Sequence, residues 1–256
     1  MSALVLKIIA CAAMLIDHIG AAWGITEFRY IGRLAFPIFA FLLVNGFRHT
    51  RSTGKYMLRM AIFAVISEVP YDLLFSWKWV DFSRQNVFIT LFLGLACIAM
   101  FDEAKKKSIL LAMVPVAVCC AVAMALNCDY SYIGILTVMA CHLFYGDDFK
   151  NRALLAAAML LLSSWYAISF HAANFVLDTT GFDLHAHFYS KPFFFASPGY
   201  KQIFRVFALI PIFMYNGKKG AMPRSKVAAK AVQYGFYIFY PAHILIIFLV
   251  KYFLFR

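Results

Sequence analysis

The sequence is poor in charged residues and poorest in acidic ones. Only 14% of its 256 residues are charged, and 12 Asp and Glu stand against 24 Lys and Arg. A soluble domain carries roughly 25% charged and roughly 45–50% apolar residues, whereas this chain is 64% apolar and 18% aromatic. These proportions exclude an ordinary soluble enzyme. They predict an all-α fold, a polytopic helical bundle embedded in a membrane.

The signatures of several familiar sites are absent from the sequence. It has no glycine-rich nucleotide loop, no H-E-x-x-H helix and no G-x-S-x-G elbow. The six cysteines lack the paired spacing of a zinc site or a disulfide framework, and we interpret them as packing residues. His185 and His187 form an H-x-H pair, but a solvated loop pair is favoured over a metal site. We therefore expect no metal cofactor.

No linker, low-complexity stretch or convincing repeat divides the chain, so we expect one domain over residues 1–256. About 20 apolar residues suffice to cross a bilayer. The first segment lacks a signal-peptidase site and should be retained as a span. Hydropathy predicts about nine transmembrane helices, with eight to ten as the alternative count, over residues 3–25, 29–47, 56–76, 86–101, 108–126, 131–145, 152–176, 199–216 and 232–254.

Lysine and arginine gather in alternate connections between these segments. Residues 48–59, 105–107, 150–152 and 218–230 are rich in them, and the intervening connections carry few. The positive-inside rule places the rich connections, and with them the N-terminus, in the cytoplasm, for which we expect a bacterial inner membrane. Because these charges flank membrane spans, the formal charge of +12 requires no nucleic-acid partner. The expected surroundings are the lipid bilayer.

Two ionisable residues, Asp17 and His18, lie side by side within the first predicted span. Each such group at membrane depth costs at least about 2.5 kcal/mol, which favours a functional role. His18 shares a helix face with Cys11 and Met14, and a rise of about 1.5 Å per residue places it in the outer half of the membrane. Adjacent helical side chains diverge by about 100°, so a direct bond between Asp17 and His18 is not assured.

Further polar residues are expected at the same depth. Arg29 and Arg33 open the second span, and Arg33 enters it deeply enough to favour function over packing. Glu68 and Asp72 lie four residues apart, so their carboxylates would repel each other unless cations paired with them. Arg29 and Arg33 are expected at the same depth and could be these cations. For Arg29, Glu68 and Asp72, an ion-paired cluster that only fixes helix packing is an equal alternative. Asn86 opens the fourth span beside them.

The last span carries Tyr240 and His243, which neighbour each other on a helix. A core histidine satisfied by the tyrosine is about as well supported as a catalytic partner. At the cytoplasmic end, basic and amide side chains could hold an anionic cofactor, although membrane anchoring explains the same charges. The candidates are Asn45, Arg48, Tyr215, Asn216 and Lys218.

Six blocks cover nearly the whole chain: LIDHIG at 15–20, IGRLAFPIFAF at 31–41, ISEVPYD at 66–72, QNV at 85–87, YNGKKG at 215–220 and FYPAH at 239–243. In this order they resemble the TraX family, named after the membrane acetyltransferase that acetylates the N-terminus of conjugative F-pilin. The family is similar to the transmembrane acyltransferases, which pass an acyl group from cytoplasmic acyl-CoA to an extracytoplasmic acceptor. The connection at 179–198 is longer than the family pattern. The way in which the family recognises its acceptor is therefore the property that carries over least to this sequence.

The resemblance implies a transferase that uses acetyl-CoA as co-substrate and acetylates an amine or hydroxyl of a pilin-like peptide, a glycan or a lipid. His18 would act as general base, and Arg33 or Asn86 would stabilise the oxyanion. Asp17 would pair with Arg33. A histidine-bound acetyl intermediate is an alternative to direct transfer. Two other classes stay open, a proton-coupled transporter and a non-catalytic assembly factor for surface or pilus proteins.

Overall fold

The computed structural model describes residues 1–184, 199–221, 223 and 225–254, and within them every regular element is a helix. The all-α prediction is therefore confirmed for these residues, whereas the His185 and His187 pair lies outside them. The elements, in chain order, are α1 (Ala3–Trp23), α2 (Thr26–Gly32), α3 (Ala35–His49), α4 (Thr53–Ser76), α5 (Val87–Lys105), α6 (Ile109–Ala125), α7 (Ser131–Leu143), α8 (Phe149–Thr180), the 3₁₀ helix η1 (Tyr200–Ala208), α10 (Leu209–Phe213) and α11 (Lys226–Leu254).

Among the described residues, 5 helical segments are long and apolar enough to cross a membrane. They are α1, α2 together with α3, α5, α8 and most of α11. α6 and α7 are apolar but shorter, and α4 is long but carries Lys55, Arg59, Glu68 and Asp72. The fold is thus that of a helical membrane protein. The count of nine spans stays a prediction, although each predicted segment falls on a helical element.

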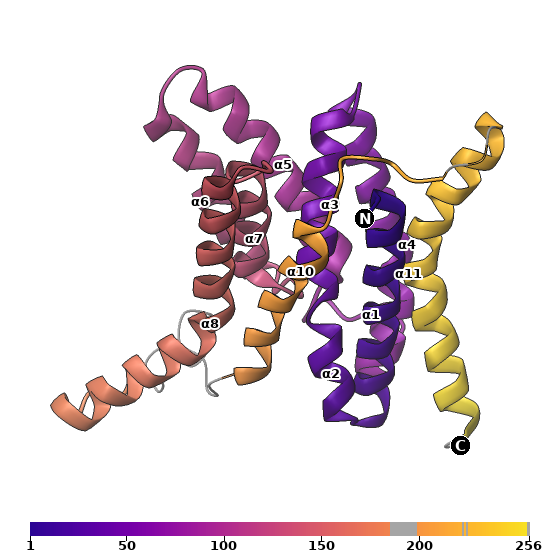
Figure 1. Ribbon diagram of the computed structural model, residues 1–256. Helices are drawn as coiled ribbons and strands as arrows, with labels where there is room; N and C mark the ends of the chain where they lie inside the picture. Colours follow the sequence, from indigo (N-terminus) through magenta and orange to yellow (C-terminus); the bar gives the residue numbers. More distant parts are fainter. Residues whose placement is uncertain (185–198, 222, 224, 255–256) are drawn as a thin grey trace.

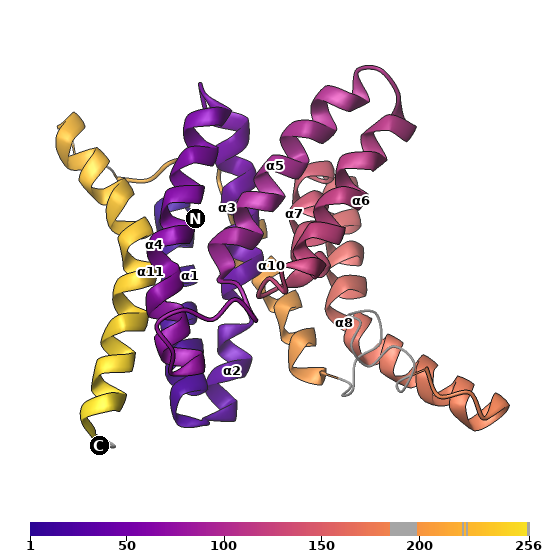
Figure 2. The same ribbon diagram turned by 180° about the vertical axis from the view of Figure 1, so that it is seen from behind.

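The helices form a bundle with two distinct ends. α1 lies beside α2, α3 and α11, and α4 packs between α11 and α5 (Figure 1). α5, α6 and α7 make the other half, which α3 joins to α1 through its contact with α7. Both views place the α5–α6 turn at one end and α2 at the opposite end (Figure 2). We call these the N-terminal end, where α1 begins, and the α2 end.

Fully buried apolar side chains fill the bundle between its ends. Leu6 on α1, Ile38 on α3 and Leu95 on α5 are 0% exposed. Close helix packing here requires small residues, since a Cβ added to Gly94 would lie 2.9 Å from Val138 of α7. This packed core separates the polar groups of the two ends.

The second predicted span is broken in the structure. Residues 29–47 are predicted as one helix, but α2 ends at Gly32 and α3 begins at Ala35. Pro37 explains the break, because proline lacks the N–H that would bond the carbonyl of Arg33, and its ring clashes with that carbonyl. Arg33 therefore lies at a helix end within the bundle.

A tight turn brings α2 back alongside α1. Gly24 ends α1 with a φ of 73°, a conformation that glycine adopts without strain. Gly20 then allows close approach, since a Cβ there would lie 2.7 Å from the Cβ of Phe28. The short helical hairpin places Arg29 of α2, and Arg33 just after it, beside Asp17 of α1.

Candidate functional site

A cavity of about 360 Å³ lies at the α2 end, and we call it the histidine cavity. The residues that line it include Asp17, His18, Arg29 and Arg33, all of which the sequence singles out. They come from α1 and from the α2 region, so the α1–α2 hairpin builds one wall. The structure thus brings together the polar residues predicted for the first two spans.

His18 forms a pair with His243 of α11. Nδ1 of His18 lies 2.7 Å from Nε2 of His243, and the two rings stack with centroids 4.9 Å apart. The side chains are buried, at 8% and 5% exposure. Nδ1 of His243 in turn lies 2.6 Å from the carbonyl oxygen of Phe239.

The partners determine which ring nitrogens carry protons. A carbonyl oxygen can only accept, so Nδ1 of His243 is protonated and donates to Phe239. In a neutral ring Nε2 of His243 is then an acceptor, and Nδ1 of His18 donates to it. It follows that Nε2 of a neutral His18 carries the lone pair, and no described residue bonds this nitrogen. Two hydrogen bonds in series therefore fix His18 in the tautomer that a general base requires.

Aromatic side chains hold the histidine pair from the sides. Tyr240 meets both rings edge-on, with centroids 5.9 Å from His18 and 5.9 Å from His243. Phe75 of α4 contacts His18 in the same way, at 5.8 Å. The alternative of a core histidine satisfied by Tyr240 is wrong, because His243 bonds His18 and Phe239 instead. Tyr240 packs against the pair rather than bonding it.

Asp17 binds both arginines of the hairpin. Its Oδ1 lies 2.8 Å from Nη2 of Arg33, and its Oδ2 lies 2.5 Å from Nη1 of Arg29. Gly32 makes room for this cluster, because a Cβ there would lie 2.0 Å from Oδ1 of Asp17. The predicted pairing of Asp17 with Arg33 is confirmed. Since both carboxylate oxygens are occupied by arginine, His243 rather than Asp17 orients His18.

The two arginines differ in what they can still bind. Arg33 also donates through Nε to the carbonyl of Arg29 and through Nη1 to Gln202, and its side chain is only 8% exposed. Arg29 donates through Nη1 alone among the described residues, to Asp17, and its side chain is 27% exposed. Arg29 therefore offers free N–H donors to the cavity, whereas Arg33 positions Arg29.

Glu68, Asp72 and Asn86 have structural partners elsewhere. Asn86 is 0% exposed and caps α5, accepting from the N–H of Phe88 while its amide donates to Glu68 and to the carbonyl of Ala64. Asp72 accepts from the backbone N–H of Asp81. The expectation that Arg29 and Arg33 meet these carboxylates is wrong, since both arginines bind Asp17. Asn86 is likewise unavailable to an oxyanion.

The loop after α4 is tied down by its own acidic residue. Asp81 accepts from the N–H of Ser83. That bond, together with hydrogen bonds from the side chains of Ser76 and Ser83, lowers the pKa of Asp81 to about 2. Asp81 thus stays ionised at neutral pH, which favours an ordered loop at the α2 end.

The site predicted from the sequence does not include several charged residues at the mouth of the histidine cavity. Arg84, Asp129 and Lys201 also line it, and all three side chains are exposed. Arg84 and Asp129 lie in connections between helices, and Lys201 lies in η1. Polar residues are common in such segments, so the sequence does not indicate which of them line a cavity. The isolated bridge between Gln85 and Cys128 is what brings two of these connections together.

At the N-terminal end, three of the predicted cofactor residues gather around one tyrosine. The hydroxyl of Tyr145 donates to Oδ1 of Asn45 at 2.6 Å, and the hydroxyl of Tyr215 donates to the same oxygen at 3.3 Å. The guanidinium of Arg48 lies over the ring of Tyr145, 4.6 Å from its centroid. Asn45, Arg48 and Tyr215 therefore share a site.

Asn216 and Lys218 clamp the N-terminus of the chain. The backbone N–H of Asn216 donates to the carbonyl of Met1, and the carbonyl of Lys218 accepts from the N–H of Ala3. Oδ1 of Asn216 accepts from the N–H of Lys218. Gly220 allows this clamp, because a Cβ there would lie 2.6 Å from Oγ of Ser2. These residues secure the start of α1, and among the described residues the exposed side chain of Lys218 and the amide nitrogen of Asn216 stay available to a ligand.

Comparisons with known proteins agree with this description. The TraX protein family model matches residues 2–251. The probable fimbrial assembly protein FimC, serogroup H1, of Dichelobacter nodosus is 30% identical over 269 residues, which cover 99% of this chain and 97% of that one. An uncharacterised protein of Rickettsia prowazekii is 34% identical over 101 residues, 39% of this chain and 37% of its own. No solved structure matches this chain significantly. The chain therefore belongs to the TraX family.

Proposed function

We propose that this protein is a membrane acetyltransferase that moves an acetyl group from cytoplasmic acetyl-CoA to an amine or hydroxyl beyond the membrane. The observation that carries the proposal is the pair of His18 and His243 at the wall of a cavity, which leaves Nε2 of His18 without a described partner. Buried ionisable groups in membrane helices are functional more often than not. The TraX family and the name of the fimbrial assembly relative support a pilus-related membrane role.

The reaction we infer is an aminolysis or alcoholysis of a thioester. As the acceptor nitrogen or oxygen attacks the acetyl carbonyl carbon, Nε2 of His18 takes its proton. The carbon–sulfur bond of the tetrahedral intermediate then breaks, and the proton passes to the sulfur of CoA. The products are the acetylated acceptor and free CoA thiol, so protons balance without a metal ion or redox partner.

The histidine pair also stabilises the charge that forms on His18. When His18 becomes imidazolium, its Nδ1–H still donates to Nε2 of His243, and that bond strengthens because the donor is charged. The carbonyl of Phe239 accepts from Nδ1 of His243 and so keeps Nε2 of that ring as the acceptor for His18. His243 is therefore a positioning residue, which aligns the base and shares its charge.

Arg29 is the best placed group to stabilise the oxyanion of the intermediate. It lines the cavity and has N–H donors that no described residue occupies. Preorganised donors of this kind typically contribute about 3 kcal/mol to a transition state. Asp17 and Arg33 would act through Arg29, by holding its guanidinium in place. This assignment replaces the earlier candidates Arg33 and Asn86.

The acceptor would enter from the mouth of the histidine cavity. Asp129 could attract the ammonium of a peptide N-terminus, and Arg84 and Lys201 could attract anionic groups of the same molecule. A pilin-like peptide is the acceptor that the fimbrial relative favours, with a glycan or lipid as alternatives. The donor would enter at the N-terminal end, near Arg48.

Two other functions use some of the same observations. A proton-coupled transporter would also contain buried histidines and arginines, and an assembly factor would accord with the printed name of the relative. The transporter predicts uptake of a solute into proteoliposomes without CoA. The assembly factor predicts normal pilus assembly when His18 is replaced but the bundle is intact.

Labelled acetyl-CoA offers the direct experiment. Purified protein in proteoliposomes is given acetyl-CoA with a radiolabelled acetyl group, together with an envelope extract as the source of acceptor. We expect label in a protein, glycan or lipid fraction and an equal amount of free CoA thiol. Label that stays on acetyl-CoA, combined with CoA-independent uptake, would favour the transporter instead.

A further inference from the structure

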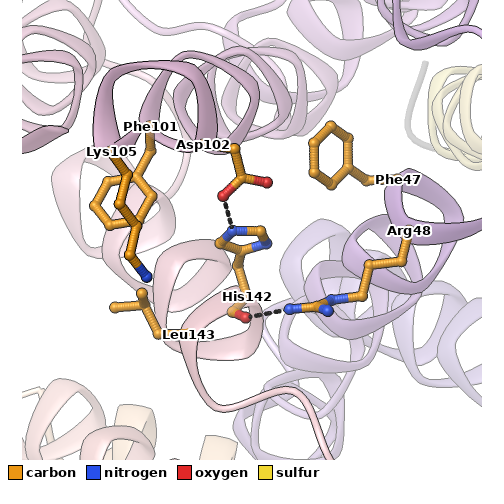
Figure 3. Close-up of a pocket in the computed structure, with 7 residues that line it drawn as sticks. All are labelled: Phe47, Arg48, Phe101, Asp102, Lys105, His142 and Leu143. Carbon is orange, nitrogen blue, oxygen red and sulfur yellow. Dashed lines mark hydrogen bonds and ion pairs between the residues drawn. The ribbon is translucent and has the colours of Figure 1, made fainter. Parts of the chain in front are cut away.

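The N-terminal end of the bundle contains a second and larger cavity, of about 510 Å³. It lies where α3, α5 and α7 end, on the side that the positive-inside rule assigns to the cytoplasm (Figure 3). Phe47 and Phe101 form apolar walls, and the polar side chains are those of Arg48, Asp102, Lys105 and His142. We call it the cytoplasmic cavity. Only Arg48 among these residues is part of the site predicted from the sequence.

His142 is the buried polar group of this cavity. It is 6% exposed, and its Nε2 lies 2.8 Å from Oδ1 of Asp102. Its Nδ1 has no hydrogen-bond partner among the described residues. Figure 3 shows this second nitrogen turned toward Phe47 and Arg48. Buried polar groups are usually hydrogen-bonded, so an unpaired nitrogen in the wall of a cavity, although it has almost no accessible surface, indicates a partner that a bound ligand could supply.

Asp102 determines what His142 can offer. A carboxylate only accepts, so Nε2 of His142 carries a proton. In a neutral ring Nδ1 of His142 is then an acceptor, to which the hydroxyl of a monoprotonated phosphate can donate.

Two permanent cations flank His142. Arg48 bonds the backbone carbonyl of His142 through Nη2 at 2.9 Å, which leaves its other N–H donors free of described partners. Lys105 lies beside Phe101, with Nζ 5.8 Å from the ring centroid, and no carboxylate among the described residues lies within ion-pair distance of it. Its neighbour Lys106 differs, because it is bonded to Glu103 at 2.7 Å.

We propose that the cytoplasmic cavity binds a phosphate group, held by Arg48, Lys105 and His142. Arginine grips phosphate oxygens with paired donors, and lysine adds a point charge. A cavity of this volume admits a ligand of nucleotide size, with Phe47 and Phe101 against its apolar part. The soluble ligand class is a phosphorylated nucleoside such as the one that CoA carries. That the phosphate belongs to the acyl donor rests on the proposed function.

Binding and chemistry would then occur at opposite ends of the bundle. His18 lies about 22 Å along the α1 axis from the first turn. The phosphate site and the base are therefore separate, and the pantetheine arm of the donor would have to displace side chains of the packed core to reach His18. Changes in the cytoplasmic cavity should raise KM for acetyl-CoA and leave kcat nearly unchanged.

The test compares two adjacent lysines. Adenosine 3′,5′-bisphosphate, a phosphate probe without a thioester, is titrated by calorimetry into the full chain in neutral detergent. We expect Lys105→Gln and His142→Gln each to weaken binding about tenfold, since each removes a polar contact to the phosphate. Lys106→Gln removes the same charge one residue away and should bind like the wild type. Equal losses for both lysine variants, or no binding by the wild type, would overturn the proposal.

A second arm separates the two sources of phosphate. Nanodiscs of phosphatidylglycerol and of phosphatidylcholine are compared, because anionic lipid headgroups also lie at this depth. We expect the bisphosphate to bind equally in both. Competition by phosphatidylglycerol that Lys105→Gln abolishes would overturn the assignment to a soluble donor. Bisphosphate binding without any acetyl transfer would count against the proposed function alone, and acetyl transfer with an unchanged KM in Lys105→Gln would count against the cytoplasmic cavity alone.

Discussion

Replacing His243 should impair acetyl transfer although this residue does not contact the acceptor. The bond from Nδ1 of His18 to His243 is 2.7 Å long and buried. In His243→Phe this N–H loses its acceptor, and an unpaired buried donor costs about 1–3 kcal/mol. If His18 relieves the cost by turning or by changing tautomer, its lone pair is lost from the cavity. The same free energy then appears as a decrease in kcat of about 5- to 150-fold.

His243→Gln separates alignment of His18 from proton transfer to His243. The side-chain amide of glutamine reaches the position of Nε2 and can accept from His18, but it cannot take up a proton. Because His243 is expected only to position His18, we predict that His243→Gln retains kcat within about tenfold of the wild type. His171→Phe, at an exposed histidine of α8, serves as the control and should keep full activity.

The assay follows labelled acetyl transfer at saturating acetyl-CoA, with thermal unfolding in detergent to confirm that each variant is folded. A folded His243→Phe with wild-type kcat would refute the alignment of His18 by His243. A glutamine variant as inactive as the phenylalanine variant would instead show that His243 itself must accept a proton.

Three further substitutions test the cluster and the orientation. Gly32→Ala should lower the unfolding temperature by an amount that corresponds to about 1–3 kcal/mol of overpacking. Gly54→Ala is the control and should not, because a Cβ there meets nothing within 4 Å. Equal effects of the two variants would contradict the close approach of Gly32 to Asp17. Asp17→Asn leaves a buried arginine unpaired and should destabilise by about 3–5 kcal/mol in denaturant titration, and an unchanged midpoint would refute the pairing. On a cysteine-free background, Thr180→Cys should react with an impermeant maleimide in intact cells and Lys219→Cys only after lysis; the reverse pattern would invert the topology.

The sequence predicts helices and depth better than it predicts neighbours. The lengths of the apolar runs predicted where the helices lie, apart from the break between α2 and α3. The cost of burying a charge singled out Asp17, His18 and Arg33 before any contact was known. The pairing of Asp17 with Arg33 could be predicted because the two residues are close in the chain and share a depth. Local pattern was sufficient there.

Contacts between distant helices could not be predicted in the same way. His18 and His243 are 225 residues apart, and helix periodicity does not say which way the last helix faces or which helix it adjoins. The predicted partners of Arg29 and Arg33 were wrong for a related reason. The hairpin turns both arginines back toward α1, so they bind Asp17 and not the carboxylates of α4. That reversal depends on Gly24 and on the break before Pro37.

Two structural roles had signals in the sequence. Asn86 immediately precedes an apolar run, the position where asparagine caps a helix, and its amide is consumed by that role. Gly217 and Gly220 flank the lysines of the YNGKKG block, and glycines in such spacing indicate a turn as readily as a ligand site. His142 and Asp102 lack a signal, because they are single polar residues near the ends of apolar segments.

Acetyl transfer by wild-type protein and by His18→Ala tests the central claim most directly. Both proteins are reconstituted in proteoliposomes with labelled acetyl-CoA and an envelope extract, and acceptor acetylation is followed by mass spectrometry. Because a general base contributes at least about 100-fold, we predict that His18→Ala folds as the wild type does and loses activity by at least about that factor. A folded His18→Ala that acetylates the acceptor at the wild-type rate would contradict the assignment of His18 as the base.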